Sequence, residues 1–319
     1  MKSNKDSPIS EKPSKKTRFK EDDIRPKKFE AEQRAAFMAD VALLLRESDG
    51  FEPVPCPACG MDDCEERFKK YGFSYVECRK CSTLYMNPRP TPSILERYYK
   101  ESVAYDYWSK YVFPASEKVR REKIFVPRVD KILDFCKRYK VDDGAILEIG
   151  AAFGTFCGEM KSRKHFKKVV ALEPTPSLAD ILRNKGIETV KSNYENADFG
   201  KDKFDAIVSF EVLEHLFSPG DFLKKCKSLL NPGGLVVLTC PNYHGFDFLV
   251  LGKECNSIDH EHLNYFNTES ISLLAEKADF EVLEVVTPGR LDAELVRNKM
   301  LDDKSVRPSK FFEKVLIDR

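Results

Sequence analysis

Four cysteines near the amino-terminal end have the spacing of a metal site. Cys56 and Cys59 form one CxxC knuckle in PCPACG, and Cys78 and Cys81 form a second in ECRKCS, with 18 residues between the inner cysteines. Each knuckle presents two thiolates from a tight turn, an arrangement that suits tetrahedral Zn²⁺. Four thiolates would close the coordination sphere, so the metal would hold the fold rather than catalyse. A site without metal is the alternative, and Cys64 lies outside the pattern.

Three of the five histidines fall in two short segments that also carry carboxylates. His215 lies in EVLEHLFSP, and His260 and His262 lie in SIDHEHLNYF with Glu261 between them. A neutral imidazole can accept a proton near physiological pH, so both segments hold candidate general bases. Each has another reading: His215 can cap or orient the helix that follows it, and the HxH pair with its carboxylates can bind a metal.

A glycine-bearing turn between two apolar runs has the features of a nucleotide site. The run Ala145 to Ile149 leads into it, and the next apolar run ends at Glu173. Gly150, Ala152 and Gly154 let the backbone approach a ligand, and the helix after them begins with unpaired N–H groups. The carboxylate of Glu173 can accept hydrogen bonds from both ribose hydroxyls. These features favour an adenosine ligand.

Glu148 argues against a dinucleotide, because the spacing here is E-x-G-x-A-x-G rather than GxGxxG. A negative charge two residues before the first glycine would repel pyrophosphate, but it can help hold the cationic, amino-acid-bearing end of S-adenosylmethionine. Three further cofactor contacts are expected from the ends of neighbouring strands: Asn193, Ser209 and Phe210. A Rossmann-like crossover that binds some other nucleotide is the alternative.

Four segments together resemble the successive landmarks of class I S-adenosylmethionine-dependent methyltransferases: LEIGAAFGTF, ALEP, FDAIVSFEVLEHL and LNPGGLVVLTCPN. They cover roughly residues 141–289. The resemblance implies an α/β fold with a Rossmann-like parallel sheet, and an enzyme with S-adenosylmethionine as its cofactor. Its sulfonium is already activated, so the protein has to align the nucleophile and remove a proton.

A narrower resemblance joins the cysteine ribbon, an aromatic linker, EVLEH and HEHLxYF. This combination is similar to sugar C-methyltransferases that act on nucleotide-linked deoxyketosugars, and to relatives in surface-polysaccharide pathways. It implies that Glu261 and His262 enolise the substrate and that His215 lies near it, so we take His262 as the base. The chain departs from this family by having Asp259 in place of a tyrosine and only about thirty residues beyond Gly289. These departures favour an O-methyltransferase that acts on a glycan or sugar precursor.

Composition limits the partners and the cellular location that the protein can have. In 319 residues, 53 Lys and Arg balance 52 Asp and Glu, which argues against nucleic acid as the main partner. No apolar run approaches the roughly 20 residues that span a bilayer, and MKSNKDSPIS has no hydrophobic signal core. We therefore expect a cytoplasmic protein with reduced thiols and a small-molecule or glycan substrate.

The elements that must position these residues follow from charge and apolar periodicity. We expect a Rossmann-like α/β domain preceded by a small zinc ribbon and a helical linker. The expected divisions are a disordered tail (1–28), a helix (29–50), the ribbon (51–90), the aromatic linker (91–140), the methyltransferase domain (141–290) and a carboxy-terminal tail (291–319). Phe280 to Val286 is expected as the sixth strand of the large sheet, and Lys314 to Asp318 is the candidate for a seventh.

The linker is dense in aromatic residues, including Tyr98, Tyr99, Tyr105 and Trp108. It can serve as a packing face between ribbon and core, or as a lid whose phenol hydroxyls face a polyhydroxylated substrate. Three functions remain open at this point. They are a saccharide methyltransferase, a methyltransferase on RNA or protein captured by the ribbon, and a non-catalytic zinc-ribbon adaptor.

Overall fold

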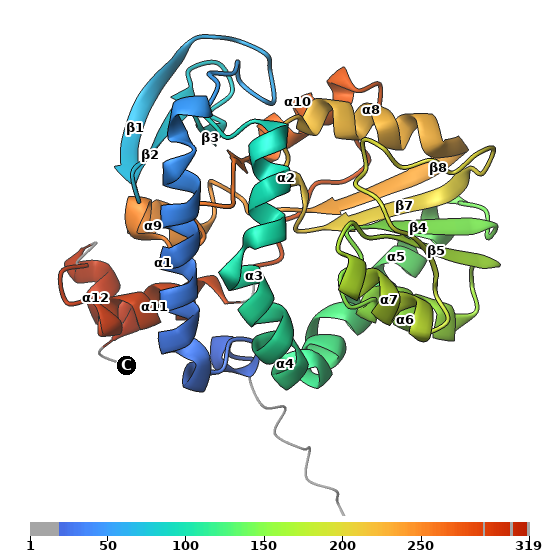
Figure 1. The fold of residues 1–319 in the computed structure, drawn as a ribbon, viewed down its shortest axis with the longest axis horizontal. Helices are drawn as coiled ribbons and strands as arrows, with labels where there is room; N and C mark the ends of the chain where they lie inside the picture. The colour runs from blue at the N-terminus through green and yellow to red at the C-terminus, as the bar shows by residue number, and fades with distance from the viewer. Residues whose placement is uncertain (1–18, 290, 307–308, 318–319) are drawn as a thin grey trace, which may run out of the picture.

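The computed structural model describes residues 19–289, 291–306 and 309–317, and in this part of the chain two sheets lie on either side of a group of helices (Figure 1). The small sheet has the order β1-β2-β3-β9, and the large one has the order β6-β5-β4-β7-β8. The strands are β1 (Cys64–Lys70), β2 (Phe73–Cys78), β3 (Leu84–Met86), β4 (Ala145–Ile149), β5 (Lys168–Leu172), β6 (Glu188–Val190), β7 (Phe204–Phe210), β8 (Leu230–Thr239) and β9 (Asn264–Tyr265). In Figure 1, α1, α2 and α3 run down the middle of the view, between the two sheets.

Helices account for most of the remaining described residues. They are α1 (Glu30–Arg46), α2 (Pro92–Glu101), α3 (Val103–Tyr107), α4 (Phe113–Arg120), α5 (Val126–Tyr139), α6 (Thr155–Arg163), α7 (Pro176–Asn184), α8 (Pro219–Leu229), α9 (Phe246–Leu251), α10 (Thr268–Lys277), α11 (Asp292–Asp302) and α12 (Lys310–Leu316). Two π turns, Trp108–Val112 and Arg121–Phe125, join α3 to α4 and α4 to α5. Pro114 and Pro127 follow shortly after these turns, and a wider turn accommodates the missing proline N–H.

The large sheet is parallel throughout its described pairs. The chain begins at β4 in the middle, moves outward to β5 and β6, and then crosses to β7 and β8 on the other side. This reversal places a topological switch between β4 and β7, where ligands bind at the carboxyl ends of the strands. Glu148 and Phe210 lie at those two strand ends. The predicted α/β class and Rossmann-like sheet are confirmed.

Both faces of the large sheet are covered, as a parallel sheet requires. Alternate residues of β4 show the two layers, because Ile146 packs in a cluster with α5 and α6, whereas Leu147 packs in a cluster with α8 and α10. The second cluster also contains Cys56 and Cys78. The cysteine ribbon therefore shares a hydrophobic core with the nucleotide-type domain.

The small sheet contains a hairpin between the two cysteine knuckles. β1 and β2 pair around Tyr71 and Gly72, both of which have positive φ (53° and 89°). Glycine suits such a turn because it has no Cβ to clash. The fourth strand, β9, comes from the segment just after His262, and it pairs with β3 through Leu84–Tyr265 and Tyr85–Asn264.

The predictions of a sixth and a seventh strand in the large sheet are wrong. Within the described residues, Phe280–Val286 has no strand partner, and Leu283, Val285 and Val286 are 41–54% exposed. Glu284 instead bonds to Lys131 and Arg138 of α5. The seventh-strand candidate falls on α12, while its last residue, Asp318, lies outside the described residues. A strand pattern produces a strand only where a ladder is completed, and a short apolar run such as KVLI suits a helix equally well.

Two segments expected to be tails are packed on the body where they are described. Residues 19–28 form short 3₁₀ turns, and the backbone N–H of Glu21 donates to Glu294 of α11 (2.9 Å). Val296 and Met300 of α11 are buried in the cluster that also holds α1 and α9 residues. The disorder expected for residues 1–18 concerns positions outside the described residues.

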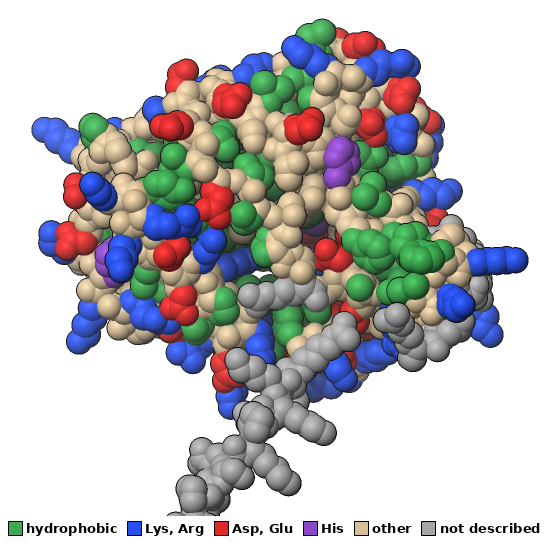
Figure 2. Space-filling model, turned by 180° about the vertical axis from the view of Figure 1, so that it is seen from behind, with side chains coloured by type: hydrophobic (Ala, Val, Ile, Leu, Met, Phe, Trp, Pro, Cys, Tyr) green, Lys and Arg blue, Asp and Glu red, His purple; other side chains and the backbone are tan. Residues whose placement is uncertain are grey.

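Basic and acidic side chains are interspersed over the face seen in Figure 2, without a large field of one sign. Within the described residues, the helices are all too short or too polar to cross a bilayer.

Candidate active site and cysteine cluster

The four predicted metal ligands meet at one point. The sulfur atoms of Cys56, Cys59, Cys78 and Cys81 all lie within 4.8 Å of one another. Cys56 and Cys81 are 3.5 Å apart and Cys59 and Cys78 are 3.4 Å apart, close to the roughly 3.8 Å expected between thiolates on a tetrahedral zinc ion. The donor set therefore fits Zn²⁺. Cys64 is not part of this group.

A cleft of about 3050 Å³ opens at the carboxyl ends of β4, β5 and β7 and extends between α1, α2 and the histidine loops. Six of the eight predicted cofactor residues line it: Glu148, Gly150, Ala152, Glu173, Asn193 and Phe210. The three predicted catalytic residues line it as well: His215, Glu261 and His262. The sequence motifs for cofactor and base thus converge on one cavity.

The turn after β4 has backbone geometry that only small residues accommodate. Gly150 has φ 78°, and a Cβ there would lie 2.6 Å from Cγ2 of Val212. Ala152 also has positive φ, at 45°. Gly154 does not line the cleft; its missing side chain makes room for Leu182 of α7. The turn therefore borders the cleft at its first glycine, and the missing side chains of both glycines make room for packing residues, Val212 at the first and Leu182 at the last.

Two buried carboxylates flank this turn. Burial raises the pKa of Glu148 to about 8, although the Cys157 thiol donates to its Oε2 (2.9 Å). Glu173 is also buried, which raises its pKa, and its oxygens accept the backbone N–H groups of Ala152 (2.8 Å) and Thr175 (2.9 Å). Each ionised carboxylate has further lone pairs to offer, so a cationic or hydroxyl-bearing ligand would satisfy them.

Ser209 does not line the cleft, contrary to the predicted contact. Its side chain is buried and its hydroxyl donates to the carbonyl of Ile149 (2.9 Å), so it ties β7 to β4.

Arg128 is a cleft residue that the sequence reasoning missed. It extends from α5, bonds to Glu211 (2.9 Å) and lies 4.6 Å over the ring of Phe210. Its charge opposes the rise in the pKa of Glu148. An arginine beside Glu148 offers donors for the carboxylate of an amino-acid ligand. Its place in an ordinary amphipathic helix gave no local signal.

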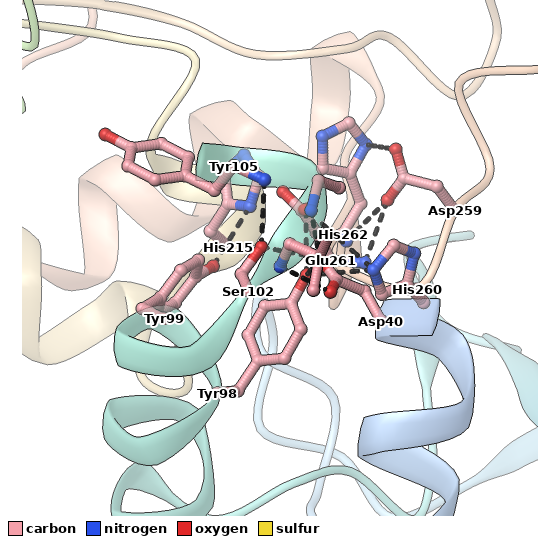
Figure 3. Close-up of polar contacts among 12 residues, drawn as sticks. Asp40, Tyr98, Tyr99, Ser102, Tyr105, His215, Asp259, His260, Glu261 and His262 are labelled. Carbon is pink, nitrogen blue, oxygen red and sulfur yellow. Dashed lines mark hydrogen bonds and ion pairs between the residues drawn. The ribbon is translucent and has the colours of Figure 1, made fainter. Parts of the chain in front are cut away.

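The loop before β9 holds His262 against its own acidic neighbour (Figure 3). Nδ1 of His262 lies 3.0 Å from the carbonyl of Ser257 and 3.6 Å from Asp259, and Oδ1 of Asp259 accepts the backbone N–H of His262 (2.9 Å). Burial alone would lower the pKa of His262, but the charges of Asp259 and Glu214 raise it above its ordinary value. Asp259, which stands where the sugar C-methyltransferases have a tyrosine, thus raises the pKa of His262.

His215 lies beside His262 with its ring centroid 4.6 Å away, in an edge-to-face arrangement. Nδ1 of His215 is 3.2 Å from the hydroxyl of Tyr99. Burial and the neighbouring His262 lower the pKa of His215 to about 3, so it stays neutral. A neutral histidine here can donate or accept a hydrogen bond toward a substrate, but it is a weak base.

His260 packs toward α1 and α2. It is 1% exposed, its ring packs on Phe37, and its Nε2 lies 2.8 Å from the hydroxyl of Tyr98. That hydroxyl donates to Glu261 (2.8 Å), whose pKa burial and Asp259 raise to about 7. Tyr98 is therefore a packing residue of the linker, whereas Tyr99 and Tyr105 line the cleft.

The HxH pair does not form one chelate. Asp40, His260 and Glu261 converge in one group, and Glu214, His215 and His262 converge in another. Neither Asp40 nor Glu214 was predicted as a site residue. Glu214 is 1% exposed, its Oε2 has no hydrogen-bond partner among the described residues, and burial raises its pKa to about 8. Asp40 was detectable, because it interrupts the apolar face of α1 next to Phe37, Val41 and Leu44.

The parallel sheet, the nucleotide-type turn and the adjacent histidines define a methyltransferase. A family described as a methyltransferase domain matches residues 119–285, more than half of the chain, and the chain belongs to this family. The predicted class, an S-adenosylmethionine-dependent methyltransferase of class I, is confirmed.

Individual relatives are distant. The C-methyltransferase NovU of Streptomyces niveus is 23% identical over 248 residues, covering 75% of this chain and 54% of the relative. A ubiquinone biosynthesis O-methyltransferase of Bradyrhizobium diazoefficiens is 31% identical over 117 residues, covering 34% of this chain and 45% of the relative. A solved S-adenosylmethionine-dependent methyltransferase from Clostridium acetobutylicum has a TM-score of 0.46 at 13% identity, covering 56% of this chain and 89% of that one. The chain spans about half the length of the curated relatives it matches.

Proposed function

We propose that this methyltransferase transfers the methyl group of S-adenosylmethionine to a hydroxyl or carbon of a saccharide or a nucleotide-linked sugar, with His262 as the base. This proposal rests on the position of His262 and His215, which lie side by side in the cleft. The same cleft is lined by the predicted cofactor residues Glu148, Gly150 and Glu173. The bound cofactor would supply the activated methyl group. The residues of this chain would bind it, orient the acceptor and remove a proton.

The cofactor contacts divide between two carboxylates and one arginine. The carboxylate of Glu173 would accept hydrogen bonds from the ribose hydroxyls. The backbone N–H groups of Ala152 and Thr175, which donate to the same carboxylate, hold it in place. Glu148 would hold the ammonium group of the methionine portion, and Arg128 would bind its carboxylate. Gly150 lines the same cleft, and its missing Cβ makes room for the side chain of Val212, which also lines it.

Proton removal would fall to His262, because its pKa lies above the ordinary histidine value whereas that of His215 lies far below it. Glu261, with a pKa raised to about 7 by burial and by Asp259, would share the proton. His215 would donate or accept a hydrogen bond at the acceptor oxygen. The resemblance of the HEHLxYF and EVLEH segments to sugar C-methyltransferases supports the same roles.

The acceptor proposal is tested by incubating the protein with methyl-labelled S-adenosylmethionine and a panel of acceptors. Nucleotide-sugars, including 4-keto-6-deoxy forms, and short glycans make up the panel, with a catechol as a phenolic comparison. Mass spectrometry should find the label on a saccharide oxygen or carbon. Labelling of the phenol without labelling of any saccharide would contradict the proposal.

We also propose that Cys56, Cys59, Cys78 and Cys81 bind one structural Zn²⁺. Elemental analysis should find about one zinc per chain, because four thiolates complete a tetrahedral site. Replacing Cys56 or Cys81 by serine should remove the metal and lower thermal stability. Cys64→Ser is the matched control, since Cys64 lies in β1 outside the cluster, and it should keep the metal. Retention of full zinc content by Cys56→Ser would contradict this assignment.

A further inference from the structure

Arg89 is a fully buried cation between the ribbon and the two histidine loops. It is 0% exposed, and among the described residues it forms no ion pair with a carboxylate. Its hydrogen bonds go to the carbonyls of Met86 (3.2 Å), Phe217 (3.2 Å) and Leu263 (3.3 Å) and to Oδ1 of Asn264 (3.0 Å). Burying a charge without a counter-ion is costly, so this arrangement calls for a reason beyond filling space.

The partners of Arg89 belong to both histidine loops. Phe217 lies two residues after His215, while Leu263 and Asn264 directly follow His262. A rigid guanidinium fork that bonds to both loops fixes the distance between their backbones. A lysine in its place would reach fewer of these acceptors, because a single ammonium lacks the fork.

Asn264 completes the connection from the other side. Its Nδ2 is within hydrogen-bond distance of the carbonyls of Leu213 (3.3 Å), Glu214 (3.3 Å) and Leu216 (2.8 Å), which surround His215. The backbone N–H of Leu263 also donates to the carbonyl of Glu214 (2.8 Å). The contacts that hold the two loops together therefore include the Arg89–Asn264 pair and a direct backbone bond.

The spacing that this pair fixes is that of the imidazole rings, whose centroids are 4.6 Å apart. A small displacement of either backbone would change which groups face His262. From its own loop these are Asp259, His260 and Glu261; from the other loop they are Glu214 and His215. Tyr99 of α2 bonds to His215 on the same side.

We propose that Arg89, acting through Asn264, is a positioning residue that sets the spacing of His215 and His262 and so couples the ribbon to the acceptor site. The coupling runs through the chain that joins β3 to α2, since Arg89 also exchanges backbone hydrogen bonds with Glu52 (2.9 Å each) and lies over the ring of Tyr85. The catalytic part of this inference rests on the proposed role of His262.

The test compares Arg89→Lys, Arg89→Met and Asn264→Asp with the wild type. Asn264→Asp keeps an acceptor for Arg89 but loses the donor to the three carbonyls. Arg97→Met is the matched control, because Arg97 of α2 has a side chain that is 52% exposed and, among the described residues, pairs with Glu47 alone. The readouts are imidazole NMR titrations of the five histidines, cofactor affinity by calorimetry, kcat and KM, and thermal unfolding.

Arg89→Lys and Asn264→Asp should fold, bind the cofactor with unchanged affinity and lower kcat by roughly tenfold or more. In Arg89→Lys the titration midpoint of His262 should move to lower pH by roughly half a unit, because Glu214 moves away from it while Asp259 stays on the same loop. Asn264→Asp adds a carboxylate two residues from His262, which opposes that shift, so this variant is compared by kcat. Arg97→Met should change neither kcat nor the titration midpoint of His262. Arg89→Met extends the series if it folds.

A wild-type titration of His262 in folded Arg89→Lys would overturn the inference. So would a loss of thermal stability alone, since that is what a purely structural contact gives. The titration is read without turnover, which separates this inference from the proposed function. If His262→Ala keeps full activity while the Arg89 variants still shift the titration, the positioning role stands and the base assignment falls.

Discussion

The cofactor half and the acceptor half of the cleft are built in different ways. The centre of the cofactor half comes from one continuous stretch, in which β4, the turn at Gly150 and the end of β5 at Glu173 follow one another, and Arg128 of α5 adds to it. The acceptor half collects Tyr99, His215 and the loop at residues 259–262 from three separate parts of the chain. The first depends on local backbone geometry, whereas the second depends on packing between the ribbon, α1, α2 and the core. Mutations should therefore separate cofactor binding from turnover.

The strongest test of this separation is His262→Ala. Loss of the proposed base should reduce turnover by about 10²–10⁴-fold, with the affinity for S-adenosylmethionine unchanged, because the proposed cofactor contacts are made by other residues. Steady-state kinetics and calorimetry measure the two effects. His244→Ala is the control, since His244 is exposed outside the cleft lining. A full-rate His262→Ala protein would remove this residue as the base.

Glu173→Ala should produce the opposite pattern. The change removes a carboxylate that holds two backbone N–H groups and would receive the ribose hydroxyls, so affinity for the cofactor should fall by about 100-fold. Folding should be affected much less, which a melting curve without ligand checks. Glu188→Ala on the adjacent strand β6 is the control, because its exposed carboxylate pairs with Lys168. Unchanged affinity in Glu173→Ala would rule out the ribose assignment.

Gly150→Ala sharpens the claim that the cofactor half depends on backbone geometry. Positive φ and the overlap with Val212 should destabilise the protein by about 1–3 kcal/mol and weaken cofactor binding. Adding Val212→Ala should restore the part of the lost stability that arises from the overlap with Val212. Gly158→Ala in α6 meets open space and should be neutral or stabilising by up to about 1 kcal/mol. Equal melting temperatures for Gly150→Ala and wild type would contradict the geometric reading.

Asp259→Asn addresses the acceptor half through pH. The charge of Asp259 raises the pKa of His262, and the base must be neutral, so wild-type kcat should rise with pH through a midpoint above about 6.5, the ordinary histidine value. Asparagine keeps the Oδ1 acceptor but loses the charge. The midpoint should therefore fall by about one pH unit. An unmoved pH profile would show that a different group titrates.

The same division explains how much the sequence could predict. The turn, its acids and the four cysteines were recognisable because their chemistry depends on close spacing in the chain. Arg128, Glu214 and Arg89 were missed because each acquires its role from partners on other elements. The predictions of the sixth and seventh strands were wrong because a local pattern was not enough. The apolar pattern at residues 280–286 was present, but no neighbouring strand completes a ladder with it in the described part of the chain.

The pairing of β3 with β9 also has a consequence for how the protein is made. β3 leaves the ribosome long before residues 264 and 265 are synthesised, so its outer edge stays open while the whole nucleotide-binding core is translated. An open strand edge can pair with other chains, which makes nascent protein vulnerable to aggregation. Docking of β9 closes that edge, so the same step would protect the chain and bring His262 beside His215.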